Sequence, residues 1–443
     1  MAERAVQTAL RLGATEAEAY LKSARTTQVE FTDTVDNTKT NELSGIGIRV
    51  ALGKKTAIYS TSILDDAEVD RAAGVAVKIA RVAPEDPHWQ RMNDEFGHAP
   101  AKGFYDEAVE KLQIEDVVER LTLAIDRIRD FDERVRPSQG SLAMTVSSVF
   151  IANDHGTSHE LRDTRFRYSI RATADEGGLK SSGSAGQEAR FWRDIDFEGQ
   201  ALEAARKARD FLRSDSIPSC KTSIIVRNRI FAGILGVMLS DPINGGWVTT
   251  GRSPLSGKLG VRLAPEQVSI TDDGLMNGGW QTKPFDDEGH PTQRTPIIQN
   301  GILKGFLHNV YTALQMNVDS TGNAQRPSYS AAPEPAPNNL ILEPGKLSKE
   351  EIIRETKEGI FVEETIGEWL SNPINGSLTA TVTHGYLVEN GDLTKPVKEV
   401  IFSGDFYKIL EGGIDALGKD LANYENCYSP TVKLANLTII GKR

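Results

Sequence analysis

An apolar run that ends abruptly constrains this chain more than any other feature. The run from Arg227 to Leu239 has the composition of a buried helix, and Ser240-Asp241-Pro242 follows it directly. A proline disfavours the α conformation in the residue before it, so we expect the helix to end near Ser240. The next residues, Asn244-Gly245-Gly246, tolerate positive φ, and we interpret them as a loop.

Three further motifs follow this run in order. They are Ser253-Pro-Leu-Ser-Gly-Lys-Leu-Gly260, Asp286-Asp-Glu-Gly-His-Pro-Thr292 and Thr321-Gly-Asn-Ala324. Together with the apolar helix they resemble the TldD/PmbA family, whose TldD and TldE (PmbA) members are partner subunits of a cytoplasmic metalloprotease. The strand motif Gly45-Ile-Gly-Ile-Arg-Val50 also resembles the family's first domain.

The resemblance gives a meaning to the residues where the apolar run ends. In the TldD branch a His-Glu-x-x-x-His zinc motif follows this run, whereas here Ser240 and Gly245 stand at the ligand positions and Asp241 at the position of the glutamate. Zinc is bound by His, Cys, Asp or Glu, so neither serine nor glycine supplies a usual ligand. The chain therefore resembles the TldE/PmbA branch. We expect no cofactor in this chain and zinc in a TldD-type partner.

Length and charge narrow the class of protein. A chain of 443 residues is long enough for two domains, and its net charge of −11 disfavours a nucleic-acid partner, which requires a basic surface. The two cysteines are far apart in sequence, no apolar run approaches about 20 residues, and the N-terminus lacks the pattern of a signal peptide. We expect a cytoplasmic protein without a membrane partner.

The hydrophobic periodicity predicts an α+β fold. Residues 1–215 form an N-terminal domain, an antiparallel sheet with helices, and residues 216–443 form a β-rich C-terminal domain. A long connection at 84–103 interrupts the first domain. Asn300-Gly301 and Asn390-Gly391 have the chemistry of tight hairpin turns in the second. The expected helices are 2–12, 66–82, 114–131, 197–212 and 346–357, and the expected strands of the first domain lie within 16–62 and 140–174.

Two groups of polar residues have both a functional and a structural interpretation. His155 and His159 have the spacing of two metal ligands on a helix, but the surrounding residues predict a turn between strands, so we disfavour a metal site. Asp286-Asp287-Glu288 has the chemistry of a carboxylate metal site or an acid/base pair. We favour a structural turn in which the carboxylates bind backbone amides.

Other candidate residues lie later in the chain. The TldD branch takes a cysteine ligand from the C-terminal region, where Cys427 falls, but a lone thiol is usually packing. For Glu363-Glu364 we expect one side chain to face out and one to face a cleft. The resemblance implies that Asn323, Arg326 and Asn339 lie near an inner cavity where peptide and partner subunit meet.

These observations give one hypothesis and two alternatives. The resemblance implies a TldE/PmbA-like, non-catalytic subunit that forms a heterodimer with a TldD-type zinc-bearing subunit. Such a subunit helps to bind unfolded or small peptides by strand addition. The sequence is also compatible with a homodimer. The first alternative is a stand-alone metallopeptidase with a rebuilt site, and the second is a regulatory protein that binds DNA gyrase.

Overall fold

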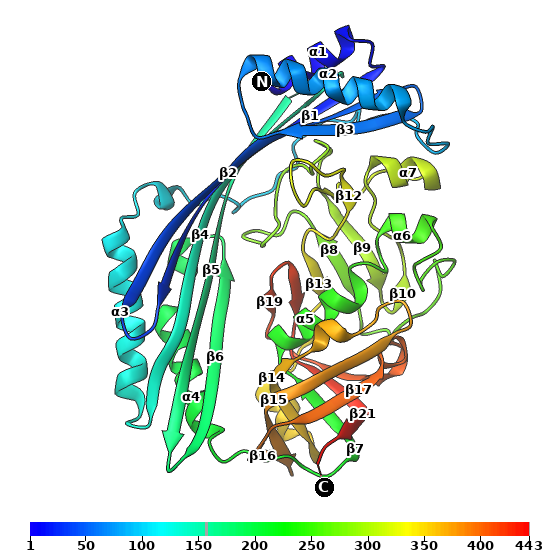
Figure 1. The fold of residues 1–443 in the computed structure, drawn as a ribbon. Helices are drawn as coiled ribbons and strands as arrows, with labels where there is room; N and C mark the ends of the chain where they lie inside the picture. The colour runs from blue at the N-terminus through cyan, green and yellow to red at the C-terminus, as the bar shows by residue number, and fades with distance from the viewer. Residues whose placement is uncertain (156–157, 443) are drawn as a thin grey trace.

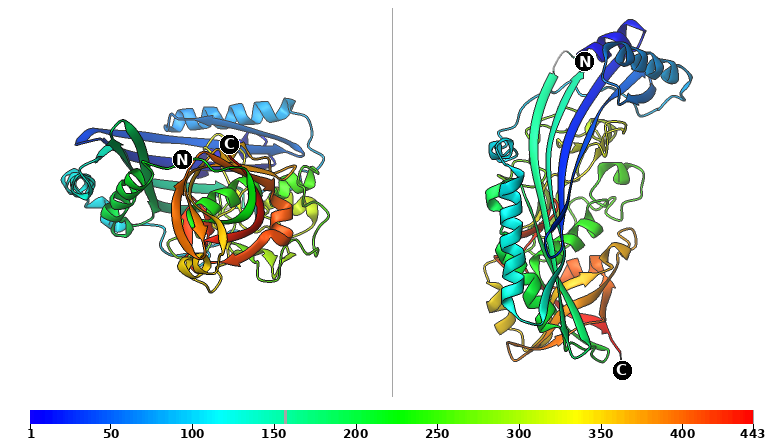
Figure 2. Two further views of the ribbon diagram at one scale, coloured as in Figure 1. Left: turned by 90° about the horizontal axis from the view of Figure 1, so that it is seen from below. Right: turned by 60° about the vertical axis from the view of Figure 1, so that its left-hand side comes forward.

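The computed structural model describes residues 1–155 and 158–442, and it confirms the α+β class (Figure 1). A six-stranded antiparallel sheet, ordered β3-β2-β1-β4-β5-β6, makes up most of the N-terminal half. Figures 1 and 2 show it as a long curved half-barrel beside the C-terminal half. Its strands are β1 (Glu16–Phe31), β2 (Val35–Leu52), β3 (Lys55–Thr61), β4 (Val135–Asn153), β5 (Ser158–Glu176) and β6 (Leu179–Ala189).

Four helices cover one face of this sheet, and all four were expected from the sequence. They pack in two groups against separate cores, one near the start of β1 and one near its end. The alternation of the strands explains both cores, because every second residue points to the helices. The helices are α1 (Ala2–Arg11), α2 (Asp66–Val82), α3 (Ile114–Phe131) and α4 (Phe197–Asp210), with short 3-10 turns η1 (Glu107–Glu110) and η2 (Trp192–Asp194).

The C-terminal half contains two more sheets. In the larger one, β14 pairs with both β7 and β15, which closes β14, β7, β21, β17 and β15 into a barrel. The second sheet has the order β10-β9-β8-β13-β20-β19, and β11 and β12 form a separate pair. The strands are β7 (Cys220–Val226), β8 (Ile270–Asp273), β9 (Arg294–Gln299), β10 (Ile302–Leu303), β11 (Ala324–Gln325), β12 (Glu334–Pro335), β13 (Leu340–Leu342), β14 (Glu358–Ile366), β15 (Ser377–Glu389), β16 (Asp392–Val397), β17 (Val400–Asp405), β18 (Ile414–Leu417), β19 (Ala422–Tyr424), β20 (Cys427–Ser429) and β21 (Val432–Ile440).

The apolar run forms α5 (Asn228–Leu239), and its end at Ser240 confirms the prediction made from the proline. The expectation of a loop at 244–246 is wrong. Asn244 caps a short helix, α6 (Gly245–Thr249), by accepting a hydrogen bond from the Gly246 amide at 2.7 Å. The remaining helical segments are α7 (Val310–Met316), α8 (Lys349–Arg354), α9 (Phe406–Lys408), η3 (Glu368–Leu370) and η4 (Ile409–Gly413).

The strand motif Gly45-Ile-Gly-Ile-Arg-Val50 places the C-terminal half against the sheet. Its even-numbered residues are buried under α1 and α2, so Gly45, Gly47 and Arg49 share the opposite face. A Cβ on Gly45 would lie 2.3 Å from the Tyr329 ring, and one on Gly47 would lie 1.7 Å from the Tyr329 carbonyl oxygen. Glycine is therefore required at both positions for the loop around Tyr329 to contact the sheet.

Candidate functional site

Two adjoining clefts lie between the N-terminal sheet and the C-terminal half. The first, here called the Asp241 cleft, has a volume of about 460 Å³. The second, the Trp89 cleft, has a volume of about 580 Å³. Asn244, Glu334 and Pro335 line both clefts, so the segment after α5 and strand β12 separate them.

The first two motif positions after α5 lie in different surroundings. Ser240 caps α5 and faces the interior, where it interacts with the buried thiol of Cys427. Burial raises the pKa of Cys427 to about 12, against the hydrogen bond with Ser240, which lowers it. Asp241 has an exposed side chain that lines the cleft named after it. The cleft walls remove part of the water around its carboxyl group, and this partial burial raises the pKa of that group. The structure thus places Cys427 beside Ser240, the residue at the first ligand position of the zinc motif. The sequence could not establish this contact.

Gly245, at the third motif position, is in close contact with a buried histidine. A Cβ at this position would lie 2.4 Å from His308 Nδ1 and 2.8 Å from the Leu307 carbonyl oxygen. His308 Nδ1 lies 3.1 Å from Thr312 Oγ1, and burial lowers the pKa of His308 to about 4. The neutral imidazole therefore occupies the space that a side chain at 245 would need.

These residues do not fit a zinc ion. Ser240 supplies a hydroxyl, Gly245 supplies nothing, and Asp241 points into a cleft away from the Ser240–Cys427 contact. A hydrolytic zinc site needs three protein ligands of the His, Asp, Glu or Cys type. Within the described part of the chain, no group of three or more such side chains is placed to hold a metal ion.

A proline-rich segment at 333–337, here called the strap, forms the boundary between the two clefts. Its carbonyl oxygens are held by amide side chains: Asn309 donates to Pro333, Asn244 to Pro335, Asn323 and Gln325 to Ala336, and Gln325 and Asn426 to Pro337. Since prolines also lack an amide N–H, the strap offers little to an incoming strand.

The Asp286-Asp287-Glu288 turn has the structural role that we favoured. Asp286 is fully buried and accepts hydrogen bonds from the backbone amides of Glu288, His290 and Ala324 at 2.9 to 3.0 Å. Burial and the charge of Glu288 raise the pKa of Asp286 to about 7. Asp287 accepts from Lys283 Nζ at 2.9 Å and from the Arg326 amide at 2.7 Å. Burial raises the pKa of Asp287, but Lys283 and Arg326 together outweigh burial and keep that pKa below the ordinary value.

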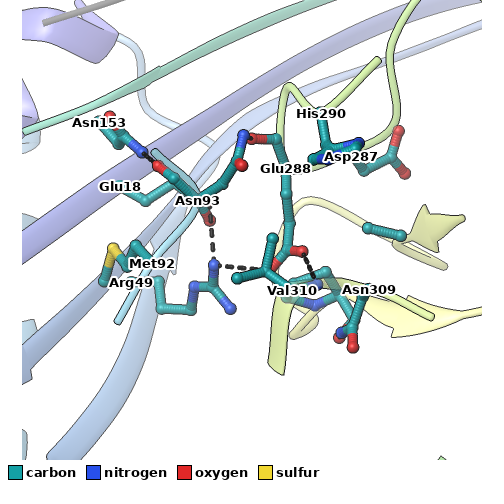
Figure 3. A network of polar contacts seen from close by, with 12 residues as sticks. Glu18, Arg49, Met92, Asn93, Asn153, Asp287, Glu288, His290, Asn309 and Val310 are labelled. Atoms are coloured by element: carbon teal, nitrogen blue, oxygen red, sulfur yellow. Dashed lines mark hydrogen bonds and ion pairs between the residues drawn. The ribbon is translucent and has the colours of Figure 1, made fainter. Parts of the chain in front are cut away.

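Glu288 belongs to a buried ionic network that joins the two halves of the chain. Arg49 Nη2 donates to Glu18 Oε2 and to Glu288 Oε1, both at 3.0 Å, as Figure 3 shows. The second oxygen of Glu18 pairs with Arg326, whose guanidinium also donates to the Asp287 and Ala331 carbonyls at 3.1 Å. The four side chains are at most 7% exposed, so the network is almost entirely buried.

Of the three residues expected near peptide or partner, only Arg326 lines a cleft, whereas Asn323 and Asn339 are buried. Arg326 lines the Asp241 cleft, although its guanidinium is committed to the ionic network. Asn323 and Asn339 have no exposed surface; the Asn323 amide binds Asp272 at 2.7 Å and the Asn339 amide binds the Asp273 carbonyl at 2.7 Å. That these residues contact peptide or partner stays a prediction.

His155 and His159 do not form a pair in the described residues. His155 is exposed in a turn after β4, and residues 156–157 between the two histidines lie outside the described part of the chain. His159 is buried against the rings of His98 and Phe285, with ring centroids 4.1 and 4.9 Å away, and burial lowers its pKa.

The prediction that Glu363 and Glu364 face opposite ways is wrong. Irregular pairing in β14 around Glu364 breaks the alternation, and both side chains line one charged cavity between α4 and β14. Glu363 pairs with Arg206, and Glu364 lies 3.1 Å from His384 Nδ1. His384 Nε2 also lies 2.7 Å from the carbonyl oxygen of Ser182 on β6, so His384 is part of an interdomain contact.

Sequence reasoning missed several residues that shape the clefts. Arg49 was seen only as part of a strand motif, and Trp89 lies in a connection that showed no periodicity. His308 had no neighbouring signal at all. The one available clue was Asn244, since asparagine is a usual helix N-cap.

Comparison with known proteins gives consistent results along most of the chain. Sequence models of PmbA/TldA metallopeptidases match it in three segments: domain 1 at residues 17–80, the central domain at 107–212 and the C-terminal domain at 219–441. The chain is 26% identical to Metalloprotease PmbA of Escherichia coli O157:H7, covering 99% of this chain and 96% of the relative. It is 27% identical to Metalloprotease MJ0996 of Methanocaldococcus jannaschii, covering 88% and 87%.

Solved structures share the fold over the whole chain. A candidate modulator of a DNA gyrase from Thermotoga maritima is 26% identical, with a TM-score of 0.88 and coverage of 99% of this chain and 98% of the other. TldE from Thermococcus kodakarensis has a TM-score of 0.91 at 23% identity, covering 99% of both chains. At that identity, the second likeness concerns the fold alone.

Proposed function

Because the chain belongs to the PmbA/TldD family of metallopeptidases, we propose that it is a TldE/PmbA-type subunit that does not cleave peptides itself. A TldD-type subunit carries the zinc and the two form a heterodimer. The observation that supports this proposal is the closed space at Gly245. The His308 ring and the Leu307 carbonyl leave no room for a ligand side chain at a position where the catalytic branch has histidine.

This chain's contribution is to bind the peptide in the two clefts. Asp241 and Glu334 line the Asp241 cleft, and across residues 1–155 and 158–442 neither carboxylate makes a hydrogen bond or an ion pair. Free carboxylates on a cleft wall attract the amino terminus or the lysine and arginine side chains of a peptide. Trp89 and Tyr311 give the Trp89 cleft an apolar wall that suits larger side chains.

The ionic network and the strap hold the clefts in shape. Arg49 and Arg326 come from opposite halves of the chain and share Glu18, so the sheet cannot move from the C-terminal half without exposing a buried charge. Asn244 fixes the strap from the segment that also carries Asp241 and Gly245. The segment 240–245, which stands where the catalytic branch has its zinc motif, thus forms part of the wall of the peptide cleft.

The test is reconstitution with a zinc-motif paralogue from the same organism. We expect the purified chain to leave an unfolded polypeptide intact. We expect the mixture with the paralogue to cleave it in a chelator-sensitive way, faster than the paralogue alone. The double variant Asp241→Asn, Glu334→Gln should raise the KM for basic peptides in the mixture with little change in kcat. Chelator-sensitive cleavage by this chain alone would instead support a stand-alone metallopeptidase.

A further inference from the structure

The cavity that contains Glu363 and Glu364, here called the charged cavity, lies between the two halves of the chain. Its volume is about 710 Å³. Strands β5 and β6 and helix α4 form one wall, and α5, β14, η3 and β19 form the other. Figure 1 shows β6 facing α5, β14 and β19. The proposed function gives this cavity no role.

The walls of the charged cavity carry more carboxylates than basic groups. Among the described residues, six glutamates and four basic side chains line it. Each of the three arginines already forms an ion pair with a glutamate of the chain, and Lys207 lies 3.0 Å from Glu203. The arginine pairs, at 2.5 to 2.7 Å, are Arg227–Glu203, Arg229–Glu188 and Arg167–Glu425. The excess charge of the cavity is therefore negative.

Glu368, at the start of η3, is a carboxylate that has no cation beside it. Its Oε2 accepts a hydrogen bond from Thr365 Oγ1 at 3.4 Å, and within residues 1–155 and 158–442 it forms no ion pair. Glu363 gives one oxygen to Arg206, and its Oε2 is buried without a hydrogen-bond partner among the described residues. Carboxylate oxygens open to a further cation thus extend from the partly exposed Glu368 to the buried Glu363.

Two exposed aromatic side chains accompany Glu368. Trp369 is 61% exposed and Tyr424 is 48% exposed, so both rings offer a free face, and both line the charged cavity. Burial raises the pKa of Tyr424 and the charge of Glu368 adds to the rise, which places these two side chains near each other. Aromatic faces beside a carboxylate attract an ammonium or guanidinium group.

The charged cavity adjoins the Asp241 cleft. Arg165 lines the Asp241 cleft and Arg167 lines the charged cavity. The two residues lie on one face of β5, roughly 7 Å apart. Both guanidinium groups lie over the ring of Trp280, at 5.6 and 5.7 Å from its centroid. One extended peptide in the Asp241 cleft therefore reaches the charged cavity by passing Trp280.

We propose that the charged cavity is a second recognition site for the peptide and binds one arginine or lysine side chain. The cation lies against Trp369 and Tyr424 and pairs with Glu368, while the amino-terminal part of the peptide occupies the Asp241 cleft. This inference rests on the proposed function and adds a substrate class, peptides with a basic residue downstream of the amino terminus. The net charge of −11 favours the approach of such peptides.

The first experiment measures the binding of peptides to the purified full chain by fluorescence anisotropy. Each peptide begins with arginine, continues with glycine and serine, and carries fluorescein at its carboxyl end. A second arginine is moved along the peptide one position at a time. We expect the tightest binding at one spacing, where citrulline, which has a similar shape without the charge, should raise the dissociation constant about fivefold.

Variants of the cavity test whether this preference arises there. Glu368→Gln and Trp369→Ala should each reduce the preference for arginine over citrulline, and the double variant should abolish it. Trp369→Phe keeps an aromatic face and should retain most of it. Glu411→Gln is the matched control, because this exposed glutamate of η4 lies outside the cavity, and it should keep the full preference.

Three results would overturn the proposal. The first is equal affinity for arginine and citrulline at every spacing. The second is a preference that survives in the double variant. The third is a Trp369→Ala variant that loses only its binding to a zinc-bearing subunit, because the surface would then be a subunit contact.

Failure of this inference is distinguishable from failure of the proposed function. If the mixture with the zinc-motif paralogue cleaves unfolded peptides and the cavity variants change nothing, only this inference falls. If the wild type binds none of the peptides, the assignment of the Asp241 cleft falls with it.

A second experiment locates the downstream arginine on the chain. A benzophenone side chain next to this arginine should crosslink on illumination to residues 364–370 or 421–425, which mass spectrometry would identify. Citrulline in place of the arginine should reduce these crosslinks. Crosslinks to other segments alone would contradict the placement of the basic side chain in the charged cavity.

Discussion

Gly245→Ala should destabilise the protein, although it adds only one methyl group. The new Cβ would lie 2.4 Å from His308 Nδ1, 2.6 Å from His308 Cε1 and 2.8 Å from the Leu307 carbonyl oxygen. The carbonyl cannot retreat freely, because it accepts the Gly245 amide proton at 2.8 Å. The His308 ring is buried and lies beside Thr312, so it has no solvent to move into.

The expected loss combines three effects. Overpacking a buried contact costs about 1–3 kcal/mol. Displacing His308 from Thr312 loses a hydrogen bond of about 1 kcal/mol. Alanine in place of glycine in a helix returns up to about 1 kcal/mol, and less at the first residue of α6. We therefore expect Gly245→Ala to lower the free energy of unfolding by about 1–3 kcal/mol.

Urea unfolding followed by circular dichroism measures this loss, with Gly233→Ala as the matched control. Gly233 lies within α5, and a Cβ there would meet Tyr424 at an ordinary contact distance of 3.7 Å. The control should gain about 0.5–1 kcal/mol, since glycine in a helix interior is unfavourable. If both variants gain stability, the claim that His308 fills the space beside Gly245 is wrong.

The same contact predicts the result of restoring the zinc motif. Ser240→His, Asp241→Glu and Gly245→His together should not create a tight zinc site, because histidine at 245 needs more room than alanine. Pro242 also lies between the two ligand positions and interrupts the helix that would carry them. Calorimetric titration of the triple variant with zinc is the measurement. Tight one-to-one binding would contradict this account.

Three other predictions concern buried groups. Arg49→Met should cost about 3–5 kcal/mol because it leaves buried carboxylates unpaired, whereas Arg4→Met, which breaks an exposed ion pair, should cost much less; urea unfolding compares them. Burial raises the pKa of Asp272 to about 7, so the folded protein holds a proton that the unfolded chain loses near pH 4, and stability falls as pH rises between these values. Asp272→Asn should remove that part of the fall when unfolding free energies are measured across this range. A thiol reagent should label exposed Cys220 in the native protein but Cys427 only after unfolding, as mass spectrometry would show.

Local rules predicted much of the fold, because the strongest signals were local. Pro242 fixed the end of α5, and the apolar periodicity located all four helices over the sheet. β6 (Leu179–Ala189) was missed because its serines and glycines have low β propensity, and the strand exists because β5 pairs along its whole length. The start of α6 was missed because two glycines outweighed the capping signal of Asn244.

The site was less predictable because its contacts join distant parts of the chain. Glu18 and Glu288 meet at Arg49, and the sequence contains no local pattern that pairs them. The residues at 240, 241 and 245 were located through the family resemblance, which the family models confirm. The reason why 245 must be glycine, a histidine more than sixty residues later, became visible only in the structure.

Metal analysis of the purified chain tests the central claim most directly. After exchange into buffer with excess zinc and removal of loosely bound metal, the account predicts far less than one zinc per chain. It also predicts no change in metal content when Ser240 or Cys427 is replaced by alanine. One zinc per chain, lost in either variant, would show that the Ser240–Cys427 region holds the metal and would contradict the assignment of this chain as the zinc-free subunit.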